Sequence, residues 1–312
     1  MLAFAARRLA LSVPVVLCVV TLVFLVIRVL PGDPAQAALG ENASRVAVEA
    51  LRTRMGLDAP LPVQYLRFMS SLLQGDLGVS MINSTSVRDQ IAYNLPFTLH
   101  LTLAALIIGT VVGVPLGVYA SVHRDQTPDV LIRIFSLTGL CIPAFFLGIL
   151  LILLFGVQLH WLPAVGGGTP ETPADFVAHL VLPALTLGLI MTASVTRLTR
   201  AAMLTVIAND YVRTARAKGL REHAVVFMHT LRPALLPIVS LTGVWAVALI
   251  GDSVTTEVVF SRPGLGKMMV GAMLQRDYTS IQSVMVIYTL FVVGINLVTD
   301  LTYGLVDPRI RN

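Results

Sequence analysis

The first long apolar run of the chain, Leu9–Ile27, reads LALSVPVVLCVVTLVFLVI and contains no charged residue. A helix needs about 20 apolar residues to cross a bilayer core about 30 Å thick, because each helical residue advances the chain by about 1.5 Å. The run has this length, and Arg7 and Arg8 directly before it are typical of a membrane surface. It therefore predicts a helix that spans a membrane.

A secretory signal peptide is the alternative interpretation of the same run, with Arg7 and Arg8 as its basic region. The run is longer than the apolar region of a signal peptide, and no Ala-x-Ala cleavage site stands where one is needed. A lipoprotein signal requires a small residue before Cys18, and Leu17 occupies that position. We therefore expect a retained anchor.

Five further apolar runs of comparable length follow along the chain. They are Thr98–Ser121, Ile134–Leu159, Phe176–Thr196, Pro233–Gly251 with an extension to about Val259, and Ile281–Thr299. The fourth and sixth helices are expected to continue to about residues 200 and 305. Transmembrane strands would instead alternate apolar and polar residues in segments of about ten. The sequence thus predicts an all-α membrane protein with six transmembrane helices.

The composition agrees with this fold class. Hydrophobic residues make up 56% of the 312 residues and charged residues 12%, against roughly 25% charged residues in soluble domains. These values, with a mean hydropathy of +0.82, exclude an ordinary soluble enzyme and a disordered chain. The basic residues are scattered without aromatic residues between them, so we expect no nucleic acid partner. Cys18 and Cys141 lie in apolar runs and are interpreted as apolar packing residues.

The distribution of basic residues indicates the orientation in the membrane, since loops rich in Lys and Arg remain in the cytoplasm. With the amino terminus inside, the cytoplasmic segments contain basic residues at both ends and in two loops: Arg7, Arg8, Arg124, Arg133, Arg197, Arg200, Arg213, Arg216, Lys218, Arg221, Arg232, Arg309 and Arg311. The loop 160–175 contains no Lys or Arg and is expected outside. We therefore predict a multi-pass membrane protein with both termini in the cytoplasm.

The segment 31–96 is too long for a plain connection between two helices. It contains an amphipathic stretch, Ala47–Met55, and an aromatic stretch, Val63–Leu73, and both predict short helices on the outer face. Two interpretations stay open for this segment, a lid on the membrane surface or a docking platform for an external partner. The expected organisation is an anchor in 1–30, this extracytoplasmic loop in 31–96, and a transmembrane domain in 97–312.

The cytoplasmic loop 197–232 contains a second short helix, in the stretch DYVRTARAKG at Asp210–Gly219. Asn209 or Asp210 can cap its start, and Gly219 can end it in the left-handed conformation. The small residues expected on one side of this helix are Thr214, Ala215 and Ala217. Such a helix suits a groove in another protein, and a basic loop that contacts anionic lipid is the alternative.

Three glycines in the second apolar run recur at a spacing of four residues: Gly109, Gly113 and Gly117. Glycines at this spacing allow two helix backbones to approach closely in a membrane. The partner helix lies either within this subunit or in a second subunit, and the sequence leaves both possibilities open.

Polar and ionisable residues near or within membrane helices are functional candidates. Asp252 and Glu257 lie near the end of the fifth run, and Asn296 and Asp300 lie in the sixth. Two interpretations stay open for each of these residues: it pairs with the backbone or with a neighbouring side chain, or it lines a pathway. Asp252, Glu257 and Asn296 are the candidates for lining a pathway, and Asp252 is preferred among them.

The chain has no nucleotide or metal motif of its own. It lacks Gly-x-x-x-x-Gly-Lys-Ser/Thr, and Gly264–Met268 imitates only the end of that motif. The six histidines show no His-x-x-x-His spacing, so no metal site is expected. No Gly-x-Ser-x-Gly nucleophile motif is present. We therefore expect neither catalysis nor a cofactor in this chain.

Five stretches resemble, in the same order, the permease subunits of ABC importers of the dipeptide, oligopeptide, nickel and glutathione group. They are LPGDP at Leu30–Pro34, NLPFTL at Asn94–Leu99, Asp210–Gly219 followed by His229-x-Leu231-Arg232, Glu257–Gly266 with its PGLG, and DPRIR at Asp307–Arg311. The resemblance covers nearly the whole chain. Each stretch alone is a weak signal, and the five together in the order of the family are a specific one.

The resemblance implies the fold of a type I importer permease, with a cytoplasmic coupling helix at about 209–220 that lies in a cleft of an ATPase. The coupling residues it implies are Asp210, Tyr211, Arg213, Thr214, Ala215, Ala217, Lys218 and Gly219. The implied partners are a second homologous permease, two ATPase subunits that use ATP and Mg²⁺, and an extracytoplasmic substrate-binding protein. The binding protein would contact 31–96 and 261–280, and membrane lipid would surround the helices.

The chain departs from the wider importer pattern at one position. That pattern reads Glu-Ala-Ala-x-x-x-Gly, whereas here Arg213-Thr214-Ala215 precede Gly219. The glutamate is absent, a variation that the peptide and nickel branch shares. We accordingly expect the charge partner of Arg213 to lie on the ATPase.

The expected cargo is short peptides, with glutathione or a nickel chelate as alternatives. A self-sufficient secondary transporter is the alternative of another class. It would require inverted repeats and an ion site at the membrane centre. No repeat relates the two halves of this sequence, and no charged residue lies at the middle of the first four runs.

Overall fold

The computed structural model describes residues 2–29, 34–40, 43–54, 56–169 and 171–306. Most of them are helical, and within these ranges no β-strand forms beyond an isolated bridge between Val79 and Ser86. Residues 30–33 of the LPGDP stretch and the whole DPRIR stretch at 307–311 lie outside the described residues.

The chain divides into two compact units that are interleaved in sequence. Unit 1 comprises residues 1–5, 98–262 and 295–312, and unit 2 comprises residues 6–97 and 263–294. Two long helices, α5 (Val87–Val122) and α13 (Tyr278–Val306), contribute residues to both units. Unit 2 is discontinuous in sequence, because the returning segment 263–294 packs with residues from the first third of the chain. The organisation expected from the sequence, with divisions at residues 30 and 96, describes placement relative to the membrane and stays a prediction.

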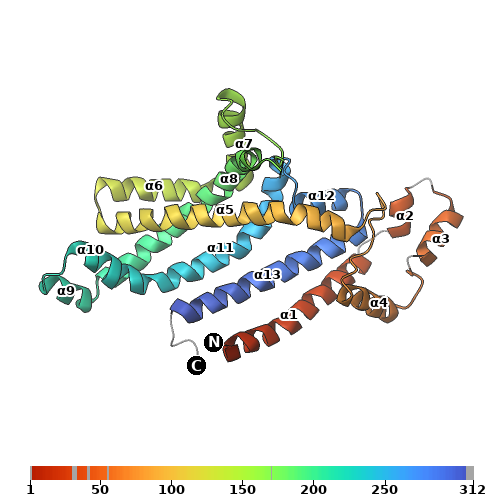
Figure 1. The fold of residues 1–312 in the computed structure, drawn as a ribbon, viewed down its shortest axis with the longest axis horizontal. Helices are drawn as coiled ribbons and strands as arrows, with labels where there is room; N and C mark the ends of the chain where they lie inside the picture. The colour runs from red at the N-terminus through yellow and green to blue at the C-terminus, as the bar shows by residue number, and fades with distance from the viewer. Residues whose placement is uncertain (1, 30–33, 41–42, 55, 170, 307–312) are drawn as a thin grey trace. The chain divides into compact units, whose positions relative to one another are not determined.

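Unit 1 is built around the long helix α8 (Pro173–Ile207), which packs against α11 (Arg232–Val259), α6 (Thr127–Cys141) and α7 (Ala144–Leu151) (Figure 1). Two π-helical stretches, η1 (Ile152–Gln158) and η2 (Val225–Leu231), and the short helices α9 (Asp210–Ala217) and α10 (Glu222–Ala224) complete it. Its largest buried cluster contains only apolar side chains: Leu101, Ala105, Ala184, Leu187, Met191, Val195 and Leu249.

The three glycines of α5 face α8 of the same chain. A Cβ atom would lie 2.5 Å from the Met191 side chain if added at Gly109, and 2.9 Å from Val195 if added at Gly113. The hydroxyl of Thr196 donates a hydrogen bond of 3.2 Å to the carbonyl oxygen of Gly113. Of the two possibilities that the sequence left open, the structure has the contact within the subunit.

Within the part of the chain that the structure describes, five helices are long and apolar enough to cross a membrane: Arg7–Arg28, Val87–Val122, Pro173–Ile207, Glu222–Val259 and Tyr278–Thr302. The sixth candidate span is a pair of helices, Thr127–Cys141 and Ala144–Gln158, bent by 105°. The second run thus begins at Val87, inside the segment expected as a loop. The third run, expected as one helix over Ile134–Leu159, is divided.

The division of the third run occurs at Ile142 and Pro143, which both have extended backbone conformations. A proline lacks the N–H that a helix interior requires, and its ring disfavours the helical conformation of the residue before it. Pro183 and Pro237, by contrast, lie inside the continuous helices α8 and α11. Proline therefore permits a break, and the packing around each helix decides whether it occurs.

Unit 2 combines α1 (Leu2–Val29, from residue 6) with α2 (Pro34–Leu39), α3 (Arg45–Arg54), α4 (Leu61–Leu73), α12 (Leu265–Leu274) and the first turns of α5 and α13. Helices α3 and α4 lie where the sequence predicts two short helices. Phe24 of α1 contacts the rings of Tyr65 and Phe68 at centroid distances of 5.3 and 5.7 Å. Aromatic packing thus holds α4 against α1.

A buried carboxylate joins two distant segments of unit 2. Asp277 accepts hydrogen bonds from the hydroxyls of Ser80 and Ser280 at 2.5 and 2.7 Å. Asn94 accepts a 3.0 Å hydrogen bond from the backbone N–H of Gly264. The segments 77–94 and 264–280 therefore form one packed surface within this unit.

Candidate functional site

The short helix α9 begins and ends at the predicted residues. Asn209 is its N-cap residue, although its side chain makes no capping hydrogen bond. Gly219 follows the helix with φ of +78°, the left-handed conformation that glycine adopts without a steric penalty. The predicted helix bounds and the glycine stop are therefore present in the structure, whereas the predicted side-chain cap is not.

One side of α9 packs onto its own chain. Val212 and Ala215 are buried against Val225 of η2 and Val206 of α8. Ala215 therefore faces the interior and does not share an outward surface with Thr214 and Ala217, which are exposed. The expected single face of three small residues is wrong for Ala215, because the helix uses that position to attach to the subunit.

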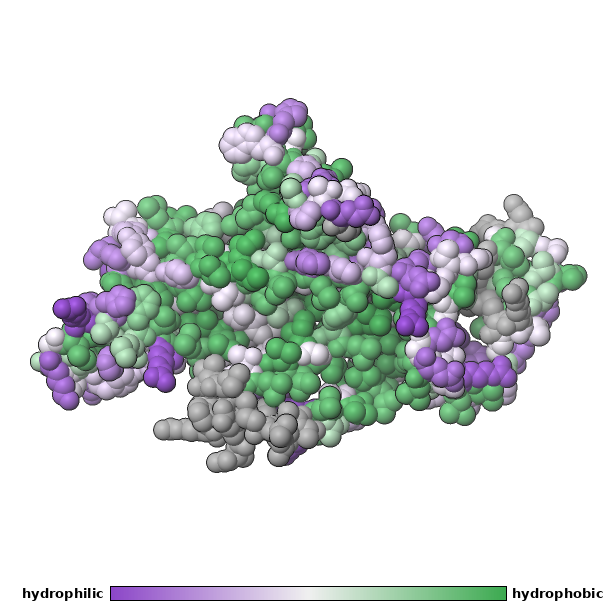
Figure 2. All heavy atoms as spheres, viewed as in Figure 1, coloured by the Kyte–Doolittle hydropathy of each residue, from purple (hydrophilic) through white to green (hydrophobic). Residues whose placement is uncertain are grey.

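The other side of α9 presents exposed basic and apolar side chains. Tyr211 on the helix and Leu220 just after it are 47% and 43% exposed. The basic residues exposed around them are Arg213, Arg216, Lys218 and Arg221. Figure 2 shows hydrophilic residues gathered over the end of unit 1 that carries α9 and α10, beside helices that are largely apolar. We call this set of exposed side chains the α9 surface.

Carboxylates of the same chain lie beside two of these arginines. Arg213 Nη1 lies 3.7 Å from Asp210 Oδ1, one helical turn away, and both side chains are exposed. Asp210 is thus a carboxylate near Arg213 within the chain, and the expected partner on the ATPase stays a prediction. Arg216 donates two hydrogen bonds, of 2.7 and 3.2 Å, to Glu222, and these raise the pKa of Arg216 above its ordinary value.

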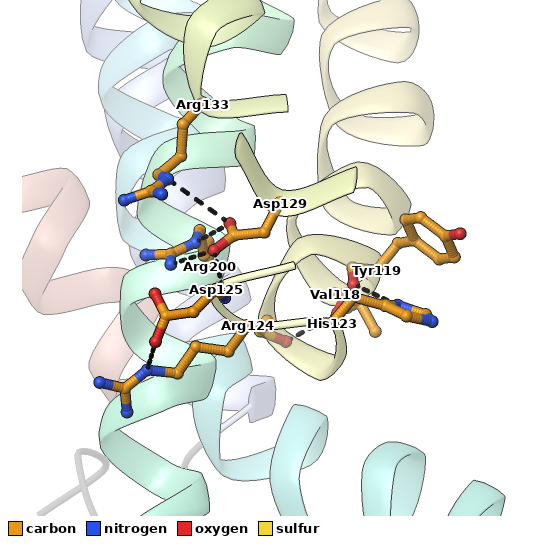
Figure 3. A network of polar contacts seen from close by, with 9 residues as sticks. Val118, Tyr119, His123, Arg124, Asp125, Asp129, Arg133 and Arg200 are labelled. Carbon is orange, nitrogen blue, oxygen red and sulfur yellow. Dashed lines mark hydrogen bonds and ion pairs between the residues drawn. The ribbon is translucent and has the colours of Figure 1, made fainter. Parts of the chain in front are cut away.

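A polar cluster that the sequence reasoning missed joins the start of α6 to α8 (Figure 3). Asp129 has no solvent exposure and accepts two hydrogen bonds from Arg200, from Nε at 2.5 Å and from Nη2 at 2.7 Å. Arg133 approaches the same carboxylate at 3.8 Å, and the backbone N–H of Asp125 donates to it at 3.0 Å. This bidentate pair fixes α6 to the part of α8 that leads into α9.

The sequence contained only part of the signal for this cluster. The spacing of Asp129 and Arg133 by four residues suits a pair on one helix face. The stronger partner, Arg200, lies 71 residues after Asp129 in the chain, and the sequence identifies it only as a cytoplasmic basic residue. Its pairing depends on the packing of α6 against α8, which periodicity alone does not define.

Glu257 lies in the interior of unit 1. Its side chain is fully buried, and its carboxylate accepts a 2.6 Å hydrogen bond from Thr98. The nearby Arg262 is also buried and donates to the carbonyl oxygens of Gly167 and His179 at 3.4 and 3.3 Å. Burial lowers the pKa of Arg262 to about 10, and the negative charge of Glu257 acts in the opposite direction. Because Glu257 belongs to one of the stretches that resemble importer permeases, the sequence favours a structural role for it over a pathway role, and its burial and its bond to Thr98 agree with the structural role.

The other two pathway candidates have a different environment. Asp252 is exposed on α11 within the candidate span Glu222–Val259, and Asn296 is exposed on α13 within the span Tyr278–Thr302. An exposed carboxylate on an apolar helix requires water or a polar partner, since a charge is costly in hydrocarbon. Across the described residues, no group of three His, Cys, Asp or Glu side chains is arranged to hold a metal ion.

Comparison with known families and structures gives consistent results. The model of the binding-protein-dependent transport system inner membrane component matches residues 113–312, and the model of the N-terminal region of such membrane components matches residues 1–102. The glutathione transport system permease protein GsiC of Pectobacterium atrosepticum is 41% identical over 311 residues, covering 100% of this chain and 99% of the relative. The GsiC of Escherichia coli K12 is 40% identical over the same coverage.

A similarity of fold is also found among solved structures. The MetNI methionine ABC transporter, in inward-facing conformations, has a chain that matches with a TM-score of 0.57 and 21% sequence identity. The match covers 70% of this chain and 96% of that one. At this identity the likeness concerns the fold, and it agrees with the predicted all-helical permease.

Proposed function

The chain belongs to the family of binding-protein-dependent transport system inner membrane components, and from this premise we propose that the α9 surface couples it to ATPase subunits. The chain is a multi-pass permease of the inner membrane and has the fold of an ABC importer permease. This membership favours the importer over the secondary transporter that the sequence left as an alternative.

The observation that carries the coupling proposal is the division of α9 into two sides. Val212 and Ala215 anchor the helix to η2 and α8, so a force on α9 is transmitted to these longer elements. The exposed side combines Tyr211 and Leu220 with the basic residues around them. Exposed aromatic and basic side chains on one surface are typical of protein interfaces.

In this mechanism the ATPase subunits bind ATP and Mg²⁺ and move against one another. Their motion displaces α9 and shifts a pair of permeases between two states, each open to one side of the membrane. The loaded binding protein favours one of these states from outside. The second permease in this pair is a homologous subunit. Both termini and α9 lie in the cytoplasm, and the surface formed by the segments 77–94 and 264–280 faces the binding protein.

The proposed cargo is a short peptide, and glutathione is the form that the full-length similarity to GsiC supports. Dipeptides are the other short peptides considered, and nickel chelates are the alternative cargo. Asp252 is the side chain that we propose to face the pathway. Its carboxylate can pair with the amino group that every such peptide carries, because opposite charges attract strongly where water is scarce.

The test is ATP hydrolysis by the reconstituted complex of this chain, a second permease, the ATPases and the binding protein. Dipeptides, tripeptides, glutathione and nickel–histidine are added in turn, and one class should stimulate hydrolysis. Gly219→Pro should abolish the stimulation, because proline fixes φ near −65° where +78° is required.

Gly271→Ala is the matched control, since a Cβ atom there meets open space and α12 remains helical. Stimulation that persists in an assembled complex with Gly219→Pro would contradict coupling through α9. Transport by this chain alone, without ATPases, would contradict the importer mechanism as a whole.

A further inference from the structure

Two side-chain hydrogen bonds hold α4 beside the end of α1. Nε of Arg28, the last residue of the candidate span Arg7–Arg28, donates a 2.8 Å hydrogen bond to Gln64. The hydroxyl groups of Thr21 and Tyr65 are joined by a 2.7 Å hydrogen bond. Thr21 stands seven residues before Arg28 and therefore lies about 10 Å deeper along the helix. Helix α4 thus contacts the last two turns of the span (Figure 1).

Helix α4 keeps to the level of Arg28 from its first turn to its last. Gln64, in the first turn, and Ser71, in the last, line the same cavity of about 280 Å³ as Arg28. Asp76, just after the helix, lines this cavity too. A helix that entered the bilayer alongside α1 would instead move away from Arg28 by about 1.5 Å with each residue. The axis of α4 therefore runs along the membrane surface at the Arg28 end of the span.

The consecutive residues Gln64, Tyr65 and Leu66 show which side of α4 faces the hydrocarbon. Neighbouring residues of an α-helix are rotated by about 100° about its axis, because 3.6 residues make one turn. Gln64 reaches the end of the span, and Tyr65 reaches the deeper Thr21. Leu66 continues this rotation on the side nearer the membrane centre. Arg67, one residue further, is rotated back towards the cavity that it lines with Arg28.

The side of α4 that carries Leu66 is apolar and exposed. Four residues share it at spacings of four, three and four positions, and we call them the α4 stripe: Pro62, Leu66, Met69 and Leu73. Leu66 and Leu73 are the most exposed large apolar side chains of this helix, at 66% and 84%. Arg67 and Gln74, which follow them directly, are exposed on the polar side. Helix α4 thus has two apolar sides, one packed on α1 and one without a described partner.

The surroundings of the α4 stripe favour lipid as its occupant. Leu22 and Leu25, in the turns of α1 that contact α4, are 56% and 47% exposed within the candidate span and therefore meet hydrocarbon. The α4 stripe extends this apolar surface sideways at the end of the span. Arg67 is the only charged residue of α4, and it lies away from the stripe. A helix with an apolar side next to hydrocarbon and a polar side next to water is typical of the membrane interface.

We propose that α4 is an interfacial helix whose stripe rests on the acyl chains of the bilayer at the Arg28 end of α1. It occupies the corner between α1 and the membrane plane, with Tyr65 and Phe68 on α1, the α4 stripe on lipid, and Arg67 in water. Of the two interpretations that the sequence left open for the segment 31–96, this assigns α4 to the membrane surface and not to a docking platform. The inference depends on the membrane location of the chain and is independent of its cargo and of α9.

The test measures the depth of nitroxide labels in the assembled transporter in phosphatidylcholine nanodiscs. Cys18→Ala and Cys141→Ala first remove the two exposed native thiols. Single labels are then placed by four substitutions that form two matched pairs of neighbours: Leu66→Cys with Arg67→Cys, and Leu73→Cys with Gln74→Cys. Electron paramagnetic resonance compares collisions with oxygen, which concentrates in hydrocarbon, and with chromium oxalate, which stays in water.

We expect a higher ratio of oxygen to chromium collisions at 66 than at 67, and at 73 than at 74, with no change when the binding protein is added. If Leu66→Cys does not assemble, the second pair decides alone. Equal ratios within the pairs would contradict the proposal, because the stripe would then lie in water. Protection of position 66 from both reagents would also contradict it and indicate a protein partner. A loss of collisions at 66 on adding the binding protein would identify α4 as a docking platform instead.

Discussion

Asp129 illustrates how a single charged residue is accommodated in a helix of a membrane protein. Its carboxylate is removed from solvent, so it must be fully hydrogen-bonded, and Arg200, Arg133 and the N–H of Asp125 meet this requirement. Removing one partner of a buried ion pair leaves the other charge uncompensated. The pair thus acts as a specific connection between α6 and α8.

Asp129→Asn should therefore lower the free energy of unfolding. Loss of one partner of a buried pair typically costs about 3–5 kcal/mol, and because Arg200 keeps some exposure we expect about 2 kcal/mol. The measurement is denaturation in mixed micelles followed by far-ultraviolet circular dichroism. Asp58→Asn is the control, since the exposed Arg52–Asp58 pair should contribute at most about 0.5 kcal/mol. Equal effects of the two substitutions would contradict the assigned role of Asp129.

The exposed carboxylate of Asp252 leads to a prediction about function. Asp252→Asn should reduce uptake of peptides with a free amino group relative to amino-blocked analogues, since it removes the charge that pairs with that group. The measurement is the uptake of both kinds of peptide into proteoliposomes, expressed as the ratio of free-amino to amino-blocked peptide. Glu171→Gln, on the loop 160–175, is an exposed control of the same chemistry. An unchanged ratio in a normally assembled transporter would show that Asp252 does not select cargo.

At the scale of the elements, much of the structure is predictable from apolar periodicity and local stop signals. The long apolar runs predict the membrane helices, and Asn209 and Gly219 predict the two ends of α9. Three features depend on packing and were not predictable in this way. They are the break at Ile142–Pro143, the early start of α5 at Val87, and the burial of Ala215.

The contact of α5 with α8 leads to a second prediction at this scale. A Cβ atom at Gly117 would lie 2.7 Å from the backbone oxygen of Thr196, which cannot move without displacing α8. Gly117→Ala should therefore cost about 1–3 kcal/mol, as overpacking of a tight contact does. Gly251→Ala, in open space on α11, should be neutral or slightly stabilising. Denaturation in mixed micelles compares the free energies of unfolding of the two variants. A Gly117→Ala protein as stable as the wild type would contradict the close approach of α5 to α8.

At the scale of the whole molecule, each of the two units carries one of the surfaces that we propose for partner proteins. Unit 1 carries the α9 surface, and unit 2 carries the joined segments 77–94 and 264–280. The resemblance to importer permeases indicated a coupling helix at about 209–220 and contacts of the binding protein with 31–96 and 261–280. The Asp129 cluster was not predictable, because Asp129 and Arg200 lie 71 residues apart in the chain and meet only through tertiary packing.

We propose that the α9 surface contacts an ATPase, and site-specific photo-crosslinking is the decisive measurement of this contact. A photoreactive amino acid replaces Tyr211 in the assembled transporter, and Val46, exposed on α3 of unit 2, is the control position. We predict that illumination joins position 211, and not position 46, to an ATPase subunit and that the yield changes when ATP is added. An intact, ATP-hydrolysing complex in which position 211 captures no ATPase would contradict the mechanism.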